Sequence, residues 1–596
     1  MGILNGPRIN FWGGIRANVC TANNSDQVGD VELLDLANSM VRPGYSDEQA
    51  IDLMRTPTTN NGVPYYTNGG WNYYGDHQVN FVSATVSSQG PAGGVVDSGD
   101  LVGLPVYLLG SIDPVTGQGP FFGPVMVDLD PTSSQATQIY VGGLQIGDST
   151  APKLLIRHDT VCSSQSLSRR VLTFETDAPG SSGFNGTFQV TFPKSAVTQY
   201  DASSPIIAAL MNDAKATGIV LRFSMFEMAP PLTTDELVAA YNANTNPSNP
   251  SSGRVVGTLG PHYEGEPDTC PPGRLLSNPA LPALVPGTFA EGYALVDAAA
   301  ARLSIDTLNL FPKPSFRADR TDITSPLTPN VDYGPITVGT GSHDTPLGVT
   351  FDARPADYYK FGGIVDVPLS PQQVQLAQSM PLVLSGSNGG NSVKITEQPL
   401  RIYGDPRNIY LDDSADRQVM CSFTVAYLGG PLPADTTFDI VSSTSGTLPN
   451  PNYLTFPPHV VVRTGQSLLN LPVSDYGGAN FGFECLTIKS GTSSYFVNYR
   501  KYPKSDFGIP KGATITWQQA YDIALRFHYI VFPAMSLRIP LNDMGTVVAT
   551  AEQFLARLSP AYRNTTLCMP ITRSLSPSQI QLLDCFLSNK PWEPLP

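Results

Sequence analysis

The sequence has few charged side chains, and fewer of those are basic than acidic. Charged residues make up 14% of its 596 residues, and 35 Lys and Arg stand against 50 Asp and Glu, which gives a net charge of −15. We find no basic stripe that would offset this negative balance. Because a negatively charged chain repels a polyphosphate backbone, nucleic acid is not an expected partner.

Long apolar runs are also missing. No uninterrupted apolar stretch approaches the roughly 18 residues that a membrane-spanning helix needs. The start, MGILNGPRINFWGG, has no basic segment followed by a long apolar run, and residue 6 is Gly where an N-myristoylation signal has Ser or Thr. We therefore expect a soluble protein that is neither secreted nor bound to a membrane.

Cysteine and histidine occur without the spacings of known sites. The seven cysteines are odd in number and far apart, which favours reduced thiols and a cytoplasmic protein over a disulfide framework. The six histidines show no H-x-H or H-E-x-x-H spacing, and G-x-S-x-G, G-x-G-x-x-G and G-x-x-x-x-G-K-[ST] are absent. No complete catalytic site can therefore be identified from the sequence.

The sequence does contain a long series of short β-rich runs broken by Gly and Pro, 54 of each. Runs of this kind fill 101–259 and again 290–502, at the spacing typical of antiparallel sandwiches and barrels. Towards the C-terminus the apolar residues fall three and four apart, which predicts helices within 515–532, 546–559 and 574–588.

These patterns predict a mainly β protein. We expect two antiparallel β-sandwich or barrel-like domains, at 1–280 and 281–510, and a small helical C-terminal subdomain at 511–596. Ser574 or Ser576 is a suitable N-cap for the last helix of that subdomain.

Two helices are expected to interrupt the first β-rich region. One covers 205–216, and the other covers 233–242 with Thr233 or Thr234 as its N-cap. The uncharged loop 244–253 is rich in residues that break helices and strands, so we expect it to lie at the surface.

The segment YYTNGGWNYYGDHQVNF, from Tyr65 to Phe81, is the most ligand-like part of the sequence. Its aromatic rings alternate with small and amide side chains, so Trp71, Tyr73 and Tyr74 are candidates to stack on a planar indole. Next to them, Asp76 and His77 are candidates for an acid/base pair. The alternative is a loop that only covers the edge of a sheet.

Two further groups of charged residues are candidates for binding. Arg8 and Arg16 flank FWGGI in an expected edge strand that turns at the two glycines, where arginine could bind a substrate carboxylate through two hydrogen bonds. The alternative is an internal ion pair that holds the terminal strand. The segment GPHYEGEPDTCPPGRLL, at 260–276, gathers several titratable groups, but a solvated turn is the favoured interpretation.

Short motifs spread over nearly the whole sequence resemble one known family. They are ILNGPRINFWGGIRANVCTAN (3–23), VNFVSATV (79–86), GDLVG (99–103), DPTSSQATQIY (130–140), PPGRLL (271–276), GIVDVPL (363–369), NIYL (408–411), YDIALRFHYIVFPAMS (521–536) and RNTTLCMPITRSLSPSQ (563–579). In their order and content they look like the N-terminal region of the VioB-type iminophenylpyruvate dimer (chromopyrrolate) synthases.

This resemblance implies an enzyme or enzyme subunit of aromatic secondary metabolism. The family joins two imines derived from indole-3-pyruvate in an oxidative coupling associated with haem, and it carries a C-terminal ferritin-like module. The sequence stops at Pro596 without such a module, so we expect a partner oxidase or ferritin-like protein to supply what the module does. The alternative is a non-catalytic binding or scaffold protein that kept the fold, and a third, weaker alternative is a carbohydrate-binding protein.

The helical end also resembles the tail of bacterial cytochrome-c-like domains, in which Met-Pro precedes L-[ST]-x-x-Q-[IL]. Met569 and the residues from Leu575 to Ile580 match that tail, but C-x-x-C-H is absent, so covalent haem attachment is excluded. The resemblance makes Met569 and His528 the candidate axial ligands of a non-covalently bound haem. The alternative is that both side chains pack in a small helical core.

Overall fold

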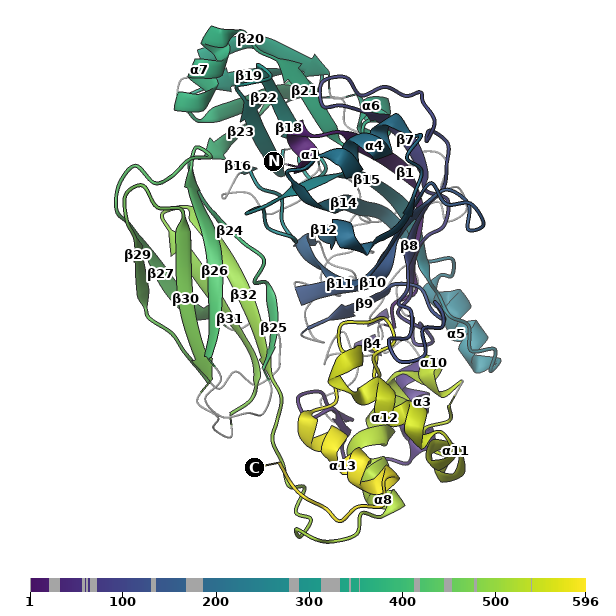
Figure 1. Cartoon of the computed structure of the whole chain (residues 1–596). Coiled ribbons are helices and arrows are strands. Elements are labelled where there is room, and N and C mark those ends of the chain that lie inside the picture. Colours follow the sequence, from purple (N-terminus) through teal and green to yellow (C-terminus); the bar gives the residue numbers. More distant parts are fainter. Residues whose placement is uncertain are drawn as a thin grey trace.

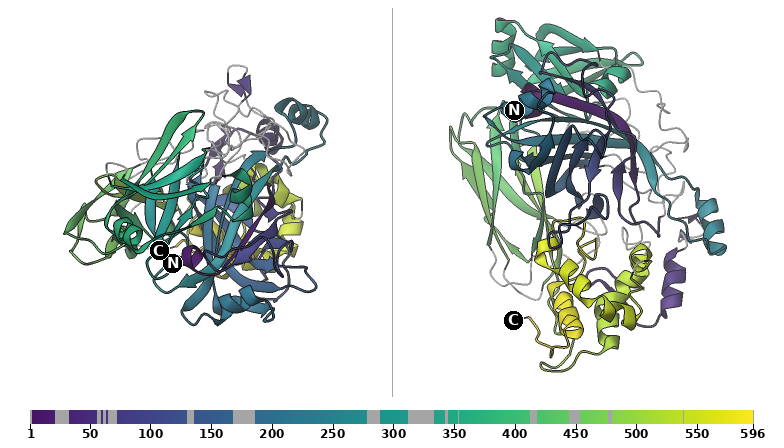
Figure 2. Two further views of the ribbon diagram at one scale, coloured as in Figure 1. Left: turned by 90° about the horizontal axis from the view of Figure 1, so that it is seen from above. Right: turned by 45° about the vertical axis from the view of Figure 1, so that its right-hand side comes forward.

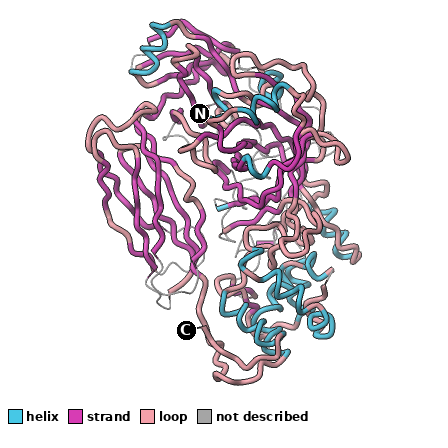
Figure 3. The backbone as a smooth tube through the Cα atoms, in the orientation of Figure 1, coloured by secondary structure: helices cyan, strands magenta, loops and turns pink. Residues whose placement is uncertain are grey.

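The computed structural model describes most of the chain, and the described part is mainly β with a group of helices near the C-terminal end (Figure 3). The described residues are 2–20, 33–55, 59–60, 63–64, 72–129, 136–167, 186–277, 289–311, 333–341, 345–352, 354–411, 418–443, 453–475, 480–537 and 539–595. The expected mainly β fold with a small helical C-terminal region is therefore confirmed. No helix among these residues is long and apolar enough to cross a membrane.

The first sheet has eleven antiparallel strands. The strands of its main path are, in order, β6 (Val79–Phe81), β1 (Arg8–Ala17), β15 (Ser251–Tyr263), β14 (Ala216–Ala229), β12 (Gly186–Pro193), β11 (Leu154–Leu167), β10 (Thr137–Ile146) and β8 (Val106–Leu109). Three further strands pair beside this path: β7 (Thr85–Gly90) with β1, β9 (Val125–Asp128) with β10, and β13 (Val197–Tyr200) with β11. Alternating apolar side chains of these strands fill its interior, among them Phe11, Leu144 and Phe223.

Hydrogen bonds between its two edges nearly close this sheet into a barrel. The amide of Val106 donates to the carbonyl of Ala84 at 2.9 Å, and the amide of Met126 donates to the carbonyl of His77, also at 2.9 Å. An isolated bridge pairs Gln78 with Val125 beside them. The segment that precedes β6 is therefore part of the seam of the barrel.

β1 lies inside the first sheet, so the expectation of an edge strand that turns at Gly13 and Gly14 is wrong. β15 pairs along one side of it, and β6 and β7 pair along the other. The glycines serve a close approach instead, because a Cβ on Gly13 would lie 2.3 Å from the carbonyl oxygen of Ser83.

A second, eight-stranded sheet covers one side of the barrel (Figure 1). Its order is β20 (Thr345–Asp352), β19 (Pro335–Thr340), β22 (Leu382–Asn388), β23 (Asn391–Gln398), β16 (Arg274–Ser277), β17 (Glu291–Asp297), β18 (Arg302–Asp306) and β21 (Ile364–Pro368). Its core takes in Phe226 and Val256 from the barrel strands. Helices α6 (Pro355–Lys360) and α7 (Pro371–Ser379) accompany this sheet.

A β-sandwich follows and lies beside the barrel (Figures 1 and 2). One layer is β24 (Leu400–Tyr403), β26 (Gln418–Tyr427), β30 (Leu468–Asp475) and β28 (Leu454–Thr455), and the other is β25 (Asn408–Leu411), β32 (Ser493–Lys501), β31 (Gly482–Ser490), β27 (Thr436–Ser443) and β29 (His459–Val462). β25 and β32 are parallel, and the other pairs are antiparallel. Phe423, Phe438 and Leu486 are fully buried between the layers.

Two helices are inserted between the strands of the barrel, and their bounds have different causes. α5 (Thr234–Asn242) begins at the expected N-cap, because Thr233 and Glu236 form a reciprocal capping box. α4 (Pro205–Asn212) ends before the expected residue 216, because the chain from Ala216 onward pairs on both sides as β14.

The loop 244–253 is only partly a surface loop. Asn249 is buried, its amide donates to Asn72 Oδ1 at 2.7 Å, and its own Oδ1 accepts from the amide of Leu232 at 2.9 Å. These bonds bring the exposed residues before Asn249 next to the segment that starts at Asn72.

The C-terminal helices lie below the barrel in Figure 1. They are α8 (Trp517–Ala520), a π-helical turn at Tyr521–Leu525, α9 (Arg526–Val531), α10 (Pro533–Ser536), α11 (Met544–Ala549), α12 (Ala551–Leu558), a 3-10 turn at Pro560–Tyr562 and α13 (Pro577–Leu587). Ser576 caps α13 through a capping box with Gln579, so one of the two expected N-caps is confirmed.

The N-terminal part of the chain packs against these helices. Two short strand pairs lie in this part of the chain, β2 (Leu34–Asp35) with β3 (Met40–Val41) and β4 (Thr59–Asn60) with β5 (Val63–Pro64). The remaining described elements are α1 (Gly2–Asn5), α3 (Asp47–Arg55) and the 3-10 turn Lys194–Ala196. Arg526 on α9 donates to Asp47 on α3 at 2.7 Å, and Tyr73 and Cys20 share a buried cluster with Phe527. Distant parts of the sequence are therefore held together at this end of the barrel.

Candidate functional site

A cavity of about 580 Å³ lies where the 72–78 segment meets the C-terminal helices. Its lining comprises Asn18, Tyr74, Gly75, Asp76, His77, Gln78, Phe122, Asn246, Ser248, Phe532, Ala534, Met535, Leu537, Ile539, Leu541, Gln553, Phe554, Arg557, Met569 and Ile571. A volume of this size suits a small organic ligand. The cavity therefore joins the aromatic segment and the helical end, the two regions in which the sequence placed most of its candidates.

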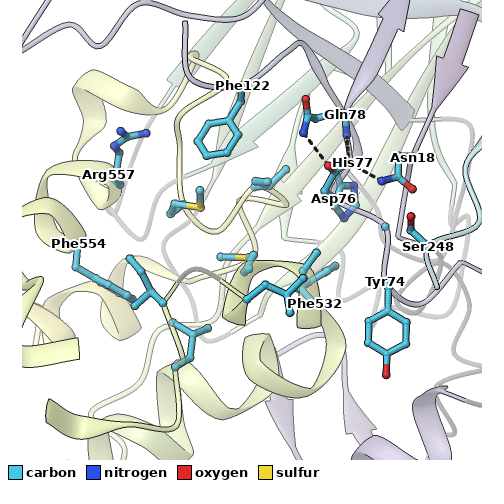
Figure 4. A pocket seen from close by; sticks show the side chains of 18 of the residues that line it. Asn18, Tyr74, Asp76, His77, Gln78, Phe122, Ser248, Phe532, Phe554 and Arg557 are labelled. Atoms are coloured by element: carbon cyan, nitrogen blue, oxygen red, sulfur yellow. Dashed lines mark hydrogen bonds between the residues drawn. The ribbon is translucent and has the colours of Figure 1, made fainter. Parts of the chain in front are cut away.

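Most of the cavity wall is apolar. Phe122, Phe532 and Phe554 contribute aromatic rings, and aliphatic and thioether side chains from the C-terminal helices fill the space around them (Figure 4). Among the described lining residues, Arg557 is the one permanent cation and Asp76 the one carboxylate. An apolar cavity with a few polar groups is typical of a site that binds a ring with polar substituents.

The segment that carries Asp76 is fixed against the helical subdomain. The hydroxyl of Tyr73 donates to the carbonyl of Ile530 at 2.5 Å, and the thiol of Cys20 lies 3.2 Å from the carbonyl of Tyr73. Burial raises the pKa of Tyr73 well above its usual value, so the phenol remains a donor. Gly75 is required here, because an added Cβ would lie 2.6 Å from the carbonyl oxygen of Asn18.

Asp76 is held by three hydrogen bonds from its neighbours. Its Oδ1 accepts from Asn18 Nδ2 at 2.8 Å and from the amide of Gln78 at 3.1 Å, and its Oδ2 accepts from Gln78 Nε2 at 2.7 Å (Figure 4). Within the described part of the chain it has no cationic partner. The half-buried carboxylate therefore faces the cavity with its orientation fixed but its charge uncompensated.

His77 has an unusual backbone and a fixed ring. Its φ of +64° is in the left-handed region, which is costly for a residue other than glycine and is often found at functional sites. Its Nδ1 lies 2.9 Å from the carbonyl of Met126, so we assign the proton to Nδ1, and its Nε2 is buried. The ring centroid is 5.5 Å from that of Phe532.

Asp76 and His77 both line the cavity, but their side chains make separate bonds. Asp76 binds Asn18 and Gln78, whereas the His77 ring binds the β9 backbone. The geometry therefore does not join them into the acid/base pair that their adjacency in the sequence suggested.

The aromatic candidates have different positions. Tyr74 lines the cavity, and its ring makes edge contact with Tyr73 at 4.8 Å. Tyr73 is fully buried behind the wall and anchors the segment. Trp71 and the aromatic residues before it lie outside the described residues.

Arg557 enters the cavity from α12. Its Nη1 donates to the carbonyl of Leu567 at 3.3 Å, and its Nη2 donates to Asp113 Oδ2 at 3.4 Å. Burial of Asp113 would raise its pKa, but hydrogen bonds from Tyr562, Thr116 and Val115 and the charge of Arg557 outweigh this, so the pKa is lowered. Asp113 therefore stays ionised next to the guanidinium.

Arg8 and Arg16 do not line the cavity. Arg8 is buried and forms two hydrogen bonds of 2.8 Å with Asp366 on β21, and it also donates to the carbonyls of Ile3 and Leu4. This geometry favours the internal ion pair over the binding of a substrate carboxylate. Arg16 is exposed on β1.

Met569 lines the cavity, whereas His528 lies behind it. The His528 ring is buried, with Nδ1 3.0 Å from the carbonyl of Ala524 and Nε2 2.8 Å from Ser574 Oγ. Burial lowers the pKa of His528 to about 4, so the ring is neutral and accepts a bond from the hydroxyl. Because both nitrogens already make bonds, the residues present do not fit an axial His and Met pair for haem.

The titratable cluster at 260–276 makes structural contacts. Arg274 is buried and pairs with Glu397 on β23, and Cys270 is buried. His262 bonds to Thr217. Over the described residues, no group of three or more His, Cys, Asp and Glu side chains could hold a metal ion.

Sequence reasoning missed several cavity residues, above all Phe532, Phe554 and Arg557. Phe554 and Arg557 belong to α12 and Phe532 follows α9, within stretches whose apolar spacing was recognised, but helical spacing does not distinguish a residue of the core from one that lines a cavity. A usable signal was the single arginine within the apolar run of α12, FLARL.

Comparisons with known proteins give one informative similarity. No known protein-family model matches the chain. Two solved structures, a protein of unknown function from Bacteroides ovatus (13% identical, 20% of this chain and 50% of that chain, TM-score 0.15) and an I-band fragment of titin (9%, 54% and 93%, TM-score 0.13), are too distant to inform the fold.

The informative similarity is to the 2-imino-3-(indol-3-yl)propanoate dimerase of Chromobacterium violaceum. The two proteins are 26% identical over 406 residues, which covers 62% of this chain. The matched region spans 38% of the length of that enzyme. This similarity supports the resemblance to the VioB-type family that the sequence motifs indicated.

Proposed function

We propose that the cavity binds an indole- or aryl-bearing 2-imino or 2-oxo acid, and that the chain is an enzyme or enzyme subunit of aromatic secondary metabolism. The observation that carries this proposal is the cavity between the 72–78 segment and the C-terminal helices, with its aromatic wall and one arginine. The similarity to the Chromobacterium enzyme, a dimerase of 2-imino-3-(indol-3-yl)propanoate, supports the substrate class.

The chemistry of the lining fits such a ligand. A flat ring gains from burial between phenylalanine rings and aliphatic side chains, at roughly 25 cal/mol per Å² of apolar surface. A guanidinium forms strong paired hydrogen bonds with a carboxylate. The cavity offers both kinds of contact, in Phe532 and Phe554 and in Arg557.

We further propose that the reaction is an oxidative coupling of two such imines. Joining two imine molecules by a new carbon–carbon bond with loss of two hydrogens releases two electrons, which an oxidant must accept. The proposal assigns this role to a partner oxidase or ferritin-like protein. The chain's own residues would bind and orient the ligand and exclude water.

A second candidate function is a non-catalytic binding or scaffold protein. It is favoured by one observation: His77 and Asp76 use their polar atoms to hold the segment in place and do not form a pair. Both candidates require ligand binding and differ only in turnover.

The first experiment measures binding of indole-3-pyruvate by isothermal titration calorimetry. We expect saturable binding by the wild-type chain and at least about tenfold weaker binding by Phe554→Ala, because a buried aromatic contact is lost. Phe586→Ala is a matched control, since Phe586 is a partly buried helix residue that packs on Trp517 outside the cavity. Absence of binding by the wild-type chain would contradict both candidates.

A second experiment separates the two candidates. L-Tryptophan and an L-amino-acid oxidase generate the imine and hydrogen peroxide in the presence of the chain, and mass spectrometry detects a coupled product. A product that depends on the chain supports the enzyme. Binding without product, with or without a co-purified partner, supports the scaffold.

A further inference from the structure

We propose that the cavity recognises its ligand at two opposite ends, with Arg557 binding the carboxylate and Asp76 accepting the N–H of an indole ring. This inference rests on the proposed function and specifies it, because it makes the ring N–H a requirement. It predicts that the chain selects indole ligands over phenyl ligands of similar shape.

Arg557 is only loosely held by the protein. Its two hydrogen bonds, to Leu567 and Asp113, measure 3.3 and 3.4 Å, longer than the usual 2.9 Å or so for an N–H donor to oxygen. Its guanidinium carbon lies 5.4 Å from the centre of the Tyr562 ring, and its side chain is 21% exposed. A guanidinium has five N–H donors, so most of its donors remain for a ligand carboxylate.

The ion pair with Asp113 still allows Arg557 to bind a ligand carboxylate. Tyr562 donates to Asp113 Oδ1 at 2.8 Å, and the amide of Val115 donates to the same oxygen at 2.9 Å. These shorter bonds satisfy the carboxylate better than the 3.4 Å contact with Arg557 does. Those bonds go to Oδ1 whereas Arg557 contacts Oδ2 through Nη2 alone, so the other N–H groups of the guanidinium can still bind a ligand carboxylate.

Asp76 has acceptor capacity that its neighbours do not use. From the described residues, its Oδ1 accepts two hydrogen bonds, whereas its Oδ2 accepts one, from Gln78. A carboxylate oxygen can accept about two, so Oδ2 can accept a further N–H. Asn18 and Gln78 hold the carboxylate in place, so little conformational entropy is lost when a ligand binds.

The two groups lie on different sides of the cavity. Figure 4 shows Arg557 on one side, the Asp76, Asn18 and Gln78 network on the other, and Phe122 between them. A ligand that contacts both must carry its carboxylate and its N–H at opposite ends. An indole-3-yl 2-oxo or 2-imino acid has this arrangement, whereas a phenyl analogue lacks the ring donor.

The test compares ligands that differ only in the ring donor. Calorimetry measures the binding of indole-3-pyruvate and of its benzothiophene analogue, in which sulfur replaces the N–H without added bulk. We expect the wild-type chain to bind the analogue roughly 10- to 100-fold more weakly, because a hydrogen bond to a charged group is lost. Asp76→Asn should bind the two ligands with nearly equal affinity.

The other end is tested with the methyl ester of indole-3-pyruvate. Arg557→Met should weaken the binding of the acid at least about tenfold and leave the binding of the ester nearly unchanged. Asp439→Asn and Arg354→Met are the matched controls, because both side chains are exposed and neither lines the cavity. Both controls should bind all three ligands as the wild-type chain does.

Each failure has a distinct meaning. Equal wild-type affinity for indole-3-pyruvate and its benzothiophene analogue would overturn the recognition of the N–H while the proposed function stands, and this comparison needs no variant to fold. An equal loss of acid and ester binding in a folded Arg557→Met variant would overturn the carboxylate contact. Absence of any indole-3-pyruvate binding would overturn this inference together with the proposed function.

Discussion

Single residues in this protein have roles that their neighbours in the sequence do not indicate. Asp76 and His77 are adjacent, yet one binds side chains of the cavity wall and the other binds the backbone of β9. Arg8, which could have bound a substrate, donates all its described bonds to the protein. The role of a polar residue here depends on which groups the fold places around it.

Arg8 provides the prediction at this scale. Arg8→Met should lower the free energy of unfolding by about 3–5 kcal/mol, because it leaves the largely buried Asp366 without its main cationic partner. Burial would raise the pKa of Asp366, and the bonds from Arg8 outweigh that effect and lower it. Indole-3-pyruvate binding should be unchanged.

Urea denaturation followed by circular dichroism measures this loss. Arg354→Met is the control, because its side chain is 71% exposed and its loss should change stability by less than about 0.5 kcal/mol. Normal stability combined with lost ligand binding in Arg8→Met would restore the carboxylate-binding hypothesis.

At the scale of elements, the helix from α8 through α9 links the core to the cavity. It contains a π-helical turn at Tyr521–Leu525, a feature that is frequent at functional sites. It places His528 in the core and ends at Phe532, whose ring stacks on His528 at 6.1 Å and lines the cavity. The packing of this one helix therefore sets part of the cavity wall.

His528 makes stability depend on pH. Its pKa is lowered by burial to about 4, below the 6.5 expected in the unfolded chain, so the unfolded state takes up a proton first as the pH falls. The stabilising contribution is complete above about pH 6.5 and is lost progressively down to about pH 4. At pH 5 we expect a loss of about 2 kcal/mol relative to neutral pH.

Comparison with His528→Gln isolates this contribution. The fall in unfolding free energy between pH 7.5 and pH 5 should be about 2 kcal/mol smaller in the variant than in the wild-type chain. His459→Gln is the control, because that side chain is 63% exposed, and it should keep the wild-type difference. If the free energy of unfolding of His528→Gln changed with pH as that of the wild-type chain does, His528 would not contribute to the pH dependence.

At the scale of the whole molecule, the cavity depends on the meeting of distant segments. The seam that closes the barrel presents Asp76 and Gln78, and the C-terminal subdomain presents Phe532, Phe554 and Arg557. The buried cluster shared by Cys20, Tyr73 and Phe527 joins these parts. A ligand that touches both walls must therefore stabilise both against local opening.

Hydrogen–deuterium exchange tests this coupling. Saturation with indole-3-pyruvate should slow exchange in peptides that cover 74–78 and in peptides that cover 532–541 and 553–557. Peptides from β27 and β29, on the sandwich, serve as the internal control and should exchange as before. Protection of one wall alone would contradict a ligand that spans the cavity.

Some parts of the fold were predictable because their causes are local. The β-rich pattern of 101–259 predicted strands in the region that holds β10, and Thr233 and Ser576 cap their helices through partners three residues away. The end of α4 was mispredicted, because pairing of β14 with two distant strands replaced the helical preference of the residues that follow Asn212.

The candidate site was predictable only in part. The sequence identified Tyr74, Asp76, His77 and Met569, all of which line the cavity, but no local pattern distinguishes Phe122, and the one signal for Arg557 is its place within the apolar run of α12. Phe122 and Arg557 complete a cavity wall in which residues hundreds of positions apart in the sequence contact one another. Such contacts depend on how the barrel closes and how the subdomain packs.

The amino-acid sequence by itself determined the β-rich character, the helical end and the resemblance to a known family, because propensity, apolar spacing, caps and motifs are properties of neighbouring residues. The tertiary structure decided that Arg8 is paired, that Asp76 and His77 make separate bonds, and that a cavity lies between the 72–78 segment and the C-terminal helices. These outcomes depend on burial and on the long-range partners of each polar group, which only the folded chain brings together.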